Sequence, residues 1–270
     1  MFPAFTSTAK STIFIAGVLL IALTTAGVAG GLILALSPLL MTLLMMFVIT
    51  RDGYSRIGWR TIGITRLGLR WWPTTLLVTA GVSALTYAAA IAFRVAETTA
   101  IAATAWPNLA SLCLTGVILA FAEEIGWRGY LHAQLRERTA VVKSSIIIGV
   151  VWVCWHLPYI LFTTYYHTDG NRTVVLILFS CSACAFSILF GLLRERSGSL
   201  WVAVLAHAGH NVAFAWIAAE FVNTSNPVLV NEYLAGDTGL FVLIGTVASA
   251  TFLLMRRSHI KPRPRACTAA

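Results

Sequence analysis

Residues 111–130 read SLCLTGVILAFAEEIGWRGY, an apolar run that ends in two adjacent carboxyl groups, Glu123 and Glu124. A run of this length and composition predicts a helix that crosses a membrane. Because a carboxylate at the bilayer centre costs about 3 kcal/mol, the pair marks a place where polar chemistry occurs. Three more polar groups, His156, His207 and Asn211, lie inside other apolar runs and are candidate partners of this pair.

The rest of the chain has the same apolar character. Of its 270 residues, 58% are hydrophobic and 11% are charged, whereas a soluble domain has roughly 25% charged residues. The composition excludes a soluble domain of ordinary size and predicts an all-α, polytopic membrane helix bundle. The net charge of +9 is interpreted as loop charge facing an anionic membrane surface, not as a nucleic-acid interface.

Eight transmembrane helices are predicted, at about 13–30, 33–50, 74–93, 108–127, 144–162, 174–193, 199–219 and 238–255. The first two divide one uncharged stretch between Lys10 and Arg51. As a single helix this stretch would be about 60 Å long, which is twice the thickness of the hydrocarbon core. We expect the chain to turn between them near Gly30 and Gly31.

An even number of crossings places both termini on one side. All Lys and Arg residues except Arg94 and Arg172 fall on that side, which predicts cytoplasmic termini, and the compact architecture favours a prokaryotic plasma membrane. The chain divides into an N-terminal helix pair with a basic, amphipathic, partly helical loop (1–72), a membrane core (73–255) and a basic tail (256–270). The tail is interrupted by prolines and is predicted to be disordered.

The first candidate motif is Glu123-Glu124-Ile-Gly-Trp-Arg128. On a helix, Glu124 and Arg128 share a face and are expected to form an ion pair. Glu123 lies about 100° around the helix, so it is left to hold a proton or a metal ion. The alternative is that both acids lie at the interface and are neutralised by Arg136 and Arg138.

Two further motifs lie in separate predicted helices. Trp152 precedes His156 by one turn, so its ring is expected to stack on the imidazole; the alternative is that His156 is a packing residue. His207 and Asn211 are also one turn apart and direct two hydrogen-bond donors at one point, as a developing oxyanion requires. His210 reaches a similar face and is the alternative to His207, which is the predicted catalytic histidine.

The predicted topology gives these motifs a common depth. Glu123, His156 and His207 lie roughly 6–18 Å below the cytoplasmic surface, which predicts one pocket open to that side. A Glu and two His form a set that zinc accepts, with a fourth position for water. Without a metal ion, Glu123 would serve as a general base.

The three motifs together, EExxxR, an aromatic residue four positions before His, and HxxxN, resemble those of the CPBP family. This family contains the type II CAAX prenyl endopeptidases and the Abi-like membrane proteases. The resemblance covers residues 108–217, and it departs from the family at Trp152, where Phe is common. It implies an intramembrane peptidase with an eight-helix core, acting on a peptide or membrane-protein substrate.

The resemblance also implies roles for the residues. Glu123 and His156 would activate water, His207 and Asn211 would hold the oxyanion, and Glu124 and Arg128 would support the pocket. Members of the family are described as metalloproteases, while a metal-free glutamate mechanism is also argued for this fold, so zinc stays open.

Other classes of function are alternatives to an intramembrane peptidase of this family. The chain has no HExxH, GxGD or GxSG motif, so the nucleophile would be water and not a side chain. A proton-coupled transporter would use the buried Glu and His as a proton relay. A catalytically idle bacteriocin-immunity or scaffold protein would use the same fold only to bind a peptide.

Overall fold

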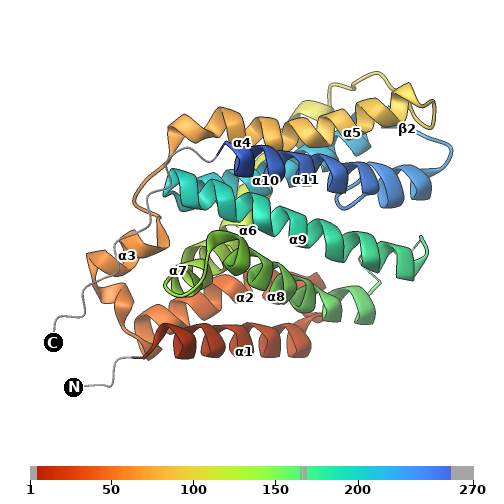
Figure 1. Cartoon of the computed structure of the whole chain (residues 1–270). Coiled ribbons are helices and arrows are strands. Elements are labelled where there is room, and N and C mark those ends of the chain that lie inside the picture. Colours follow the sequence, from red (N-terminus) through yellow and green to blue (C-terminus); the bar gives the residue numbers. More distant parts are fainter. Residues whose placement is uncertain (1–4, 165, 167–168, 257–270) are drawn as a thin grey trace.

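A computed structural model describes residues 5–164, 166 and 169–256, and the chain folds as an all-α, polytopic helix bundle (Figure 1). The predicted fold class is confirmed. The described part also contains one short antiparallel pair of strands, β1 (Glu97–Thr98) and β2 (Val222–Asn223), which the sequence did not predict. The tail from residue 257 onward lies outside the described residues.

The α-helices are α1 (Ser7–Thr25), α2 (Leu32–Leu43), α3 (Arg56–Ile62), α4 (Trp72–Val78), α5 (Ala80–Ala92), α6 (Ala105–Glu124), α7 (His132–Arg136), α8 (Val141–Phe162), α9 (Arg172–Ser197), α10 (Leu200–Glu220) and α11 (Leu240–Met255). Three segments are π-helical: Leu44–Ile49, Ile125–Leu131 and Val228–Leu234. Short 3-10 turns cover Val28–Gly31, Asp52–Tyr54 and Leu69–Trp71.

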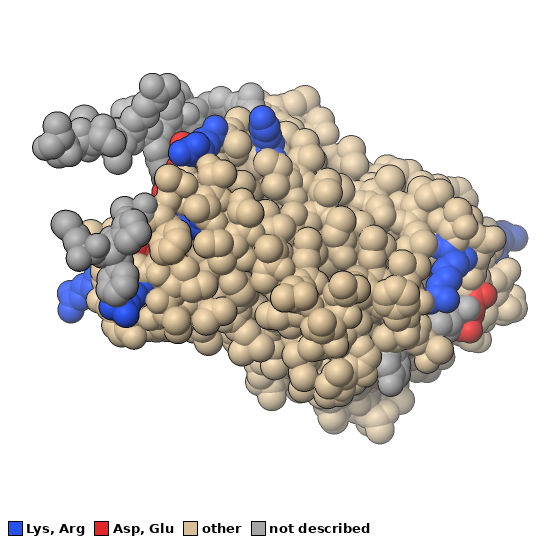
Figure 2. All heavy atoms as spheres, turned by 90° about the horizontal axis from the view of Figure 1, so that it is seen from below, with Lys and Arg blue, Asp and Glu red and all other residues tan. Residues whose placement is uncertain are grey.

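Within the described residues, 7 helical segments are long and apolar enough to cross a membrane. They are Ser7–Thr25, Val28–Ile49, Leu69–Ala92, Ala105–Arg136, Val141–Phe162, Arg172–Ser197 and Leu200–Glu220. The last predicted span corresponds to α11, an apolar helix of 16 residues. In Figure 2 the charged side chains lie toward the two ends of the molecule, and uncharged residues cover the band between them.

The long helices run roughly antiparallel, and α1 begins at the same end of the bundle at which α11 finishes (Figure 1). We call this the basic end, because it carries Arg60, Arg66, Arg136 and Arg194. The opposite end, where β1 and β2 pair, is called the strand end. Helix α10 packs against α4, α5, α6 and α9, and α8 packs against α1 and α9.

Local sequence signals account for the helix ends. The Asn171 side chain accepts hydrogen bonds from the first amides of α9, and Gly198 ends that helix in the left-handed region with φ +65°, as capping rules expect. The predicted turn between the first two helices is also present. Gly31 has φ +86°, and a Cβ there would lie 2.5 Å from the ring of Tyr159.

One predicted boundary was wrong, and one predicted span contains an interruption. The span predicted at 108–127 was ended too early, because a charged residue follows it; the helical path continues through Ile125–Leu131 and α7 to Arg136. It continues because Arg128 is paired inside the bundle and does not face water. The span predicted at 74–93 is interrupted at Thr79, whose φ of −124° and ψ of −78° separate α4 from α5.

Candidate active site

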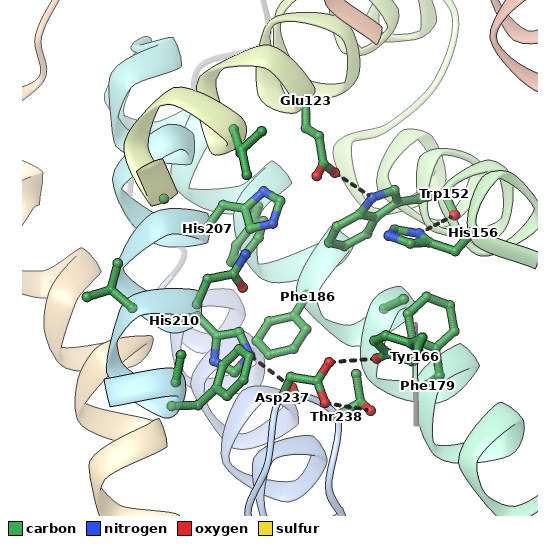
Figure 3. Close-up of a pocket in the computed structure, with 18 of the residues that line it drawn as sticks. Glu123, Trp152, His156, Tyr166, Phe179, Phe186, His207, His210, Asp237 and Thr238 are labelled. Carbon is green, nitrogen blue, oxygen red and sulfur yellow. Dashed lines mark hydrogen bonds between the residues drawn. The ribbon is translucent and has the colours of Figure 1, made fainter. Parts of the chain in front are cut away.

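A cavity of about 350 Å³ lies among α6, α8, α9 and α10 (Figure 3). Its lining includes all four residues that the sequence singled out for catalysis, Glu123, His156, His207 and Asn211. Three helices supply them: α6 carries Glu123, α8 carries His156, and α10 carries the other two. The motifs therefore meet in space, as the sequence predicted.

Beside the cavity, Glu124 joins two of the motifs. Arg128 donates from Nη1 to Oε1 of Glu124 at 2.8 Å, and neither side chain is exposed to solvent. His207 places Nδ1 at 3.0 Å from the same oxygen. Because a carboxylate accepts hydrogen bonds, this contact assigns the proton to Nδ1 and leaves Nε2 for other partners. The predicted ion pair is present, and Glu124 also orients His207.

The ring of Trp152 contacts several of these groups. Its Nε1 donates to Oε2 of Glu123 at 3.0 Å, and the guanidinium carbon of Arg128 lies 5.0 Å from the ring centroid. The predicted stacking on His156 was wrong: the two rings meet edge-on, with centroids 5.6 Å apart and an interplanar angle of 60°. The indole is oriented by its hydrogen bond to the Glu123 carboxylate, which the sequence did not predict.

His156 is held by its own helix. Its Nδ1 lies 2.9 Å from the carbonyl oxygen of Trp152, and since a carbonyl only accepts, Nδ1 carries the proton. Nε2 then presents a lone pair. The ring packs edge-on against Trp155 and Phe179, with centroid distances of 4.4 and 5.0 Å. These contacts fix the orientation of the imidazole in the cavity wall.

The structure distinguishes His210 from His207. His210 Nε2 lies 2.8 Å from the carbonyl oxygen of Asp237, and its Nδ1 lies 2.8 Å from the hydroxyl of Ser83. The carbonyl accepts a hydrogen bond from Nε2–H, so Nδ1 accepts one from the Ser83 hydroxyl, and both ring nitrogens are engaged. His210 is therefore a structural link between α10, α5 and the segment before α11, whereas His207 keeps one nitrogen available.

Sequence reasoning missed Asp237, which lines the cavity from the segment before α11. Its Oδ2 accepts a hydrogen bond of 2.6 Å from the Tyr166 hydroxyl, and Thr238 donates to Oδ1 at 3.4 Å. Burial and the nearby Asp237 charge hold the pKa of Tyr166 well above its usual range, so the phenol remains a donor. Asp237 lies just outside an apolar run, and nothing in the sequence indicates that its side chain lines a cavity.

One wall of the cavity reaches the outer surface of the bundle. On the strand-end side of Glu123, the lining continues along α6 through Leu112, Thr115, Gly116 and Leu119. Thr115 is exposed, and Leu119 is 38% exposed. On the other side of Glu123, every residue of Ile125–Leu131 is buried. The predicted opening to the cytoplasmic side stays a prediction.

The grouping of His, Cys, Asp and Glu side chains bears on whether the site holds a metal ion. Across residues 5–164, 166 and 169–256, no three His, Cys, Asp or Glu side chains are grouped so as to hold a metal ion. Glu123 and the two histidines also direct one polar atom each at a neighbour in the protein. Zinc binding by Glu123, His156 and His207 stays a prediction from the sequence.

Comparison with known proteins shows what this site is similar to. Residues 104–213 match the model of the family described as type II CAAX prenyl endopeptidase Rce1-like. All three motifs fall within the matched residues, and the resemblance drawn from them is confirmed to that extent.

One curated relative also matches. CAAX prenyl protease 2 of Methanococcus maripaludis is 40% identical to this chain over 53 residues. The aligned stretch covers 20% of this chain and 20% of that protein. The chain therefore matches about a fifth of the length of this relative.

Proposed function

We propose that this chain is an intramembrane endopeptidase that hydrolyses a peptide bond in a membrane-associated peptide or protein. One observation carries the proposal: a single cavity is lined by an acid, two oriented imidazoles and an amide, all within the residues that match the Rce1-like model. These are the groups that hydrolysis by an activated water molecule needs.

In this mechanism, Glu123 is the general base. Its Oε2 accepts a hydrogen bond from the Trp152 indole N–H, so Oε1 is the oxygen that takes a proton from water. The lone pair on His156 Nε2 orients the same water molecule. The water oxygen then forms a bond to the scissile carbonyl carbon. When the C–N bond breaks, Glu123 returns the proton to the leaving amine.

His207 and Asn211 supply the oxyanion site. Nε2 of His207 and the side-chain amide of Asn211 donate to the carbonyl oxygen as it becomes negative. For Nε2 to donate, the ring must carry protons on both nitrogens, and the buried Glu124 is the counterion for that charge. Arg128 in turn fixes the Glu124 carboxylate. Glu124 and Arg128 thus act by positioning His207.

The shape of the cavity supports a substrate that is held in the bilayer. Its side wall reaches the surface of the bundle at α6, within the apolar band, and Phe179, Phe186, Phe190 and Phe214 contribute apolar surface inside. An extended apolar segment of a membrane-anchored peptide suits such a site. We further propose that the basic end faces the cytoplasm of a prokaryotic plasma membrane, because basic loops favour that side.

The test uses the full-length protein in proteoliposomes with a library of membrane-anchored peptides, analysed for new termini by mass spectrometry. We expect cleavage by the wild type, and a loss of at least about a hundredfold in Glu123→Gln and in His207→Ala. Glu97→Gln is the matched control, because Glu97 is exposed in β1, away from the cavity.

Two further outcomes decide the alternatives. Cleavage that survives both substitutions would rule out the proposed site. Cleavage that is lost on chelation and restored by zinc would establish a metal requirement. A proton-coupled carrier predicts solute-driven proton uptake without any cleaved product, and an idle binding protein predicts peptide binding alone.

A further inference from the structure

A second concave site lies at the basic end, away from the cavity. It is a groove between the loop after α3 and the turn that joins α9 to α10, lined by Arg60, Thr65, Arg66, Arg194 and Gly198. Among these described lining residues three are arginines and none is acidic. Arg60 and Arg66 are exposed, whereas Arg194 is only 4% exposed and lies at the base of the groove.

The groove is a fixed structure. The amide of Leu200 donates to the carbonyl oxygen of Gly63 at 3.0 Å, and the Ser199 hydroxyl donates to that of Arg66 at 2.5 Å. Gly63 has φ +80°, and a Cβ there would lie 2.4 Å from Nη2 of Arg194. Loop and turn are therefore fastened together, and the backbone holds three arginines around one groove.

The surroundings of the groove are suited to an anion attached to an apolar chain. Converging cations repel one another and attract an anion to the space between them. Helix α10 begins beside Gly198 and adds the positive end of its dipole. Apolar side chains are exposed nearby: Ile57 of α3 by 75%, Leu67 of the loop by 53% and Leu69, which follows the loop, by 59%. The groove thus lies where the polar end meets the apolar band.

We propose that this groove binds the phosphate of an anionic phospholipid headgroup, with Arg60 and Arg66 contacting the phosphate and the neighbouring apolar side chains contacting the acyl chains. Bidentate donors such as guanidinium groups match phosphate geometry. The site is independent of the proposed peptidase activity, and it adds a specific lipid to the general attraction of a basic loop for the membrane.

The groove is connected to the candidate active site through Arg194. Its Nε donates to the carbonyl oxygen of Arg128 at 3.1 Å, and its Nη2 donates to that of Thr61 at 3.2 Å. Arg128 is the residue that fixes Glu124. Arg194 thus joins the base of the groove to the backbone that carries this buried ion pair.

Native mass spectrometry of the full-length protein in detergent tests the proposal by titration with phosphatidylglycerol, phosphatidylcholine or glycerol 3-phosphate. We expect preferential binding of phosphatidylglycerol, weakened about fivefold for each guanidinium removed in Arg60→Gln/Arg66→Gln. The control Arg56→Gln/Arg70→Gln has the same net charge, and its two exposed arginines do not line the groove; we expect it to bind like the wild type.

Three results would overturn the proposal. Equal weakening in both double variants would show diffuse surface attraction. Equal binding of phosphatidylcholine would exclude headgroup recognition, and equal binding of glycerol 3-phosphate would assign the groove to free phosphate. If the double variant does not fold, Arg60→Gln alone gives the same comparison, because that side chain is exposed. None of these readouts depends on peptide cleavage.

Discussion

Replacing Arg128 with Met perturbs the buried ion pair at the centre of the site. Oε1 of Glu124 and Nη1 of Arg128 are 2.8 Å apart, and both side chains are fully buried. The guanidinium carbon of Arg128 also lies 5.0 and 5.1 Å from the ring centroids of Trp152 and Phe190. Removing one partner of a buried pair costs about 3–5 kcal/mol, and the lost cation–π contacts add about 1 kcal/mol. Since Met fills part of the volume, we expect a loss of about 4 kcal/mol in the free energy of unfolding.

A double-mutant cycle separates the charge from the packing. Arg128→Met/Glu124→Gln removes both charges, so the uncompensated carboxylate disappears, and we expect a coupling energy of about 2 kcal/mol or more between the two sites. The assay is reversible unfolding in mixed micelles, followed by circular dichroism. Arg56→Met is the control, because Arg56 is exposed and its replacement should change stability by less than about 0.5 kcal/mol.

Either of two results would contradict the predicted coupling between Glu124 and Arg128. The first is a loss below about 1 kcal/mol for Arg128→Met, which would mean that Glu124 does not depend on its partner. The second is a double variant destabilised by the full sum of the two single variants, since the charges would then be acting independently.

Three further predictions concern single positions. Trp152→Phe keeps the ring and removes the indole N–H, so we expect kcat/KM for peptide cleavage to fall by about tenfold or less, and a fall of a hundredfold or more would contradict this. His210→Ala removes two hydrogen bonds, so we expect it to lower the free energy of unfolding by about 2 kcal/mol and to reduce cleavage less than His207→Ala; the reverse order would assign the available ring to His210. Gly63→Ala places a Cβ in a clash and at a φ of +80°, so we expect it to lower the free energy of unfolding by about 1–3 kcal/mol in the same assay. Gly81→Ala is the control and should not destabilise, because the nearest atom lies 3.5 Å from the added Cβ. Equal effects of the two substitutions would contradict the predicted backbone strain at Gly63.

Much of the fold was accessible from the sequence because apolar runs of bilayer length and the distribution of basic residues are local signals. Within one helix, spacing also sufficed: positions four apart share a face, which predicted the pair of Glu124 and Arg128. The end of that helix was misjudged for the same reason. A charge normally ends an apolar run, but Arg128 is neutralised inside the bundle.

Contacts between helices were not accessible in this way. Periodicity states which face a residue occupies but not which side chain meets it from another helix. The sequence left His210 as an alternative to His207, and the hydrogen bond that engages His210 comes from Ser83, which is far away in the chain. The indole bond from Trp152 to Glu123 and the inward turn of Asp237 depend equally on tertiary packing. The burial of all of Ile125–Leu131 is likewise a result of packing that an isolated amphipathic pattern does not show.

The most direct test of the central claim compares kcat for one membrane-anchored peptide between wild type and Glu123→Gln in the same proteoliposomes, with equal thermal stability as the criterion for intact folding. If Glu123 is the general base, the variant loses at least about a hundredfold in kcat. Equal rates of cleavage by two equally stable proteins would contradict the assignment of this cavity as the active site.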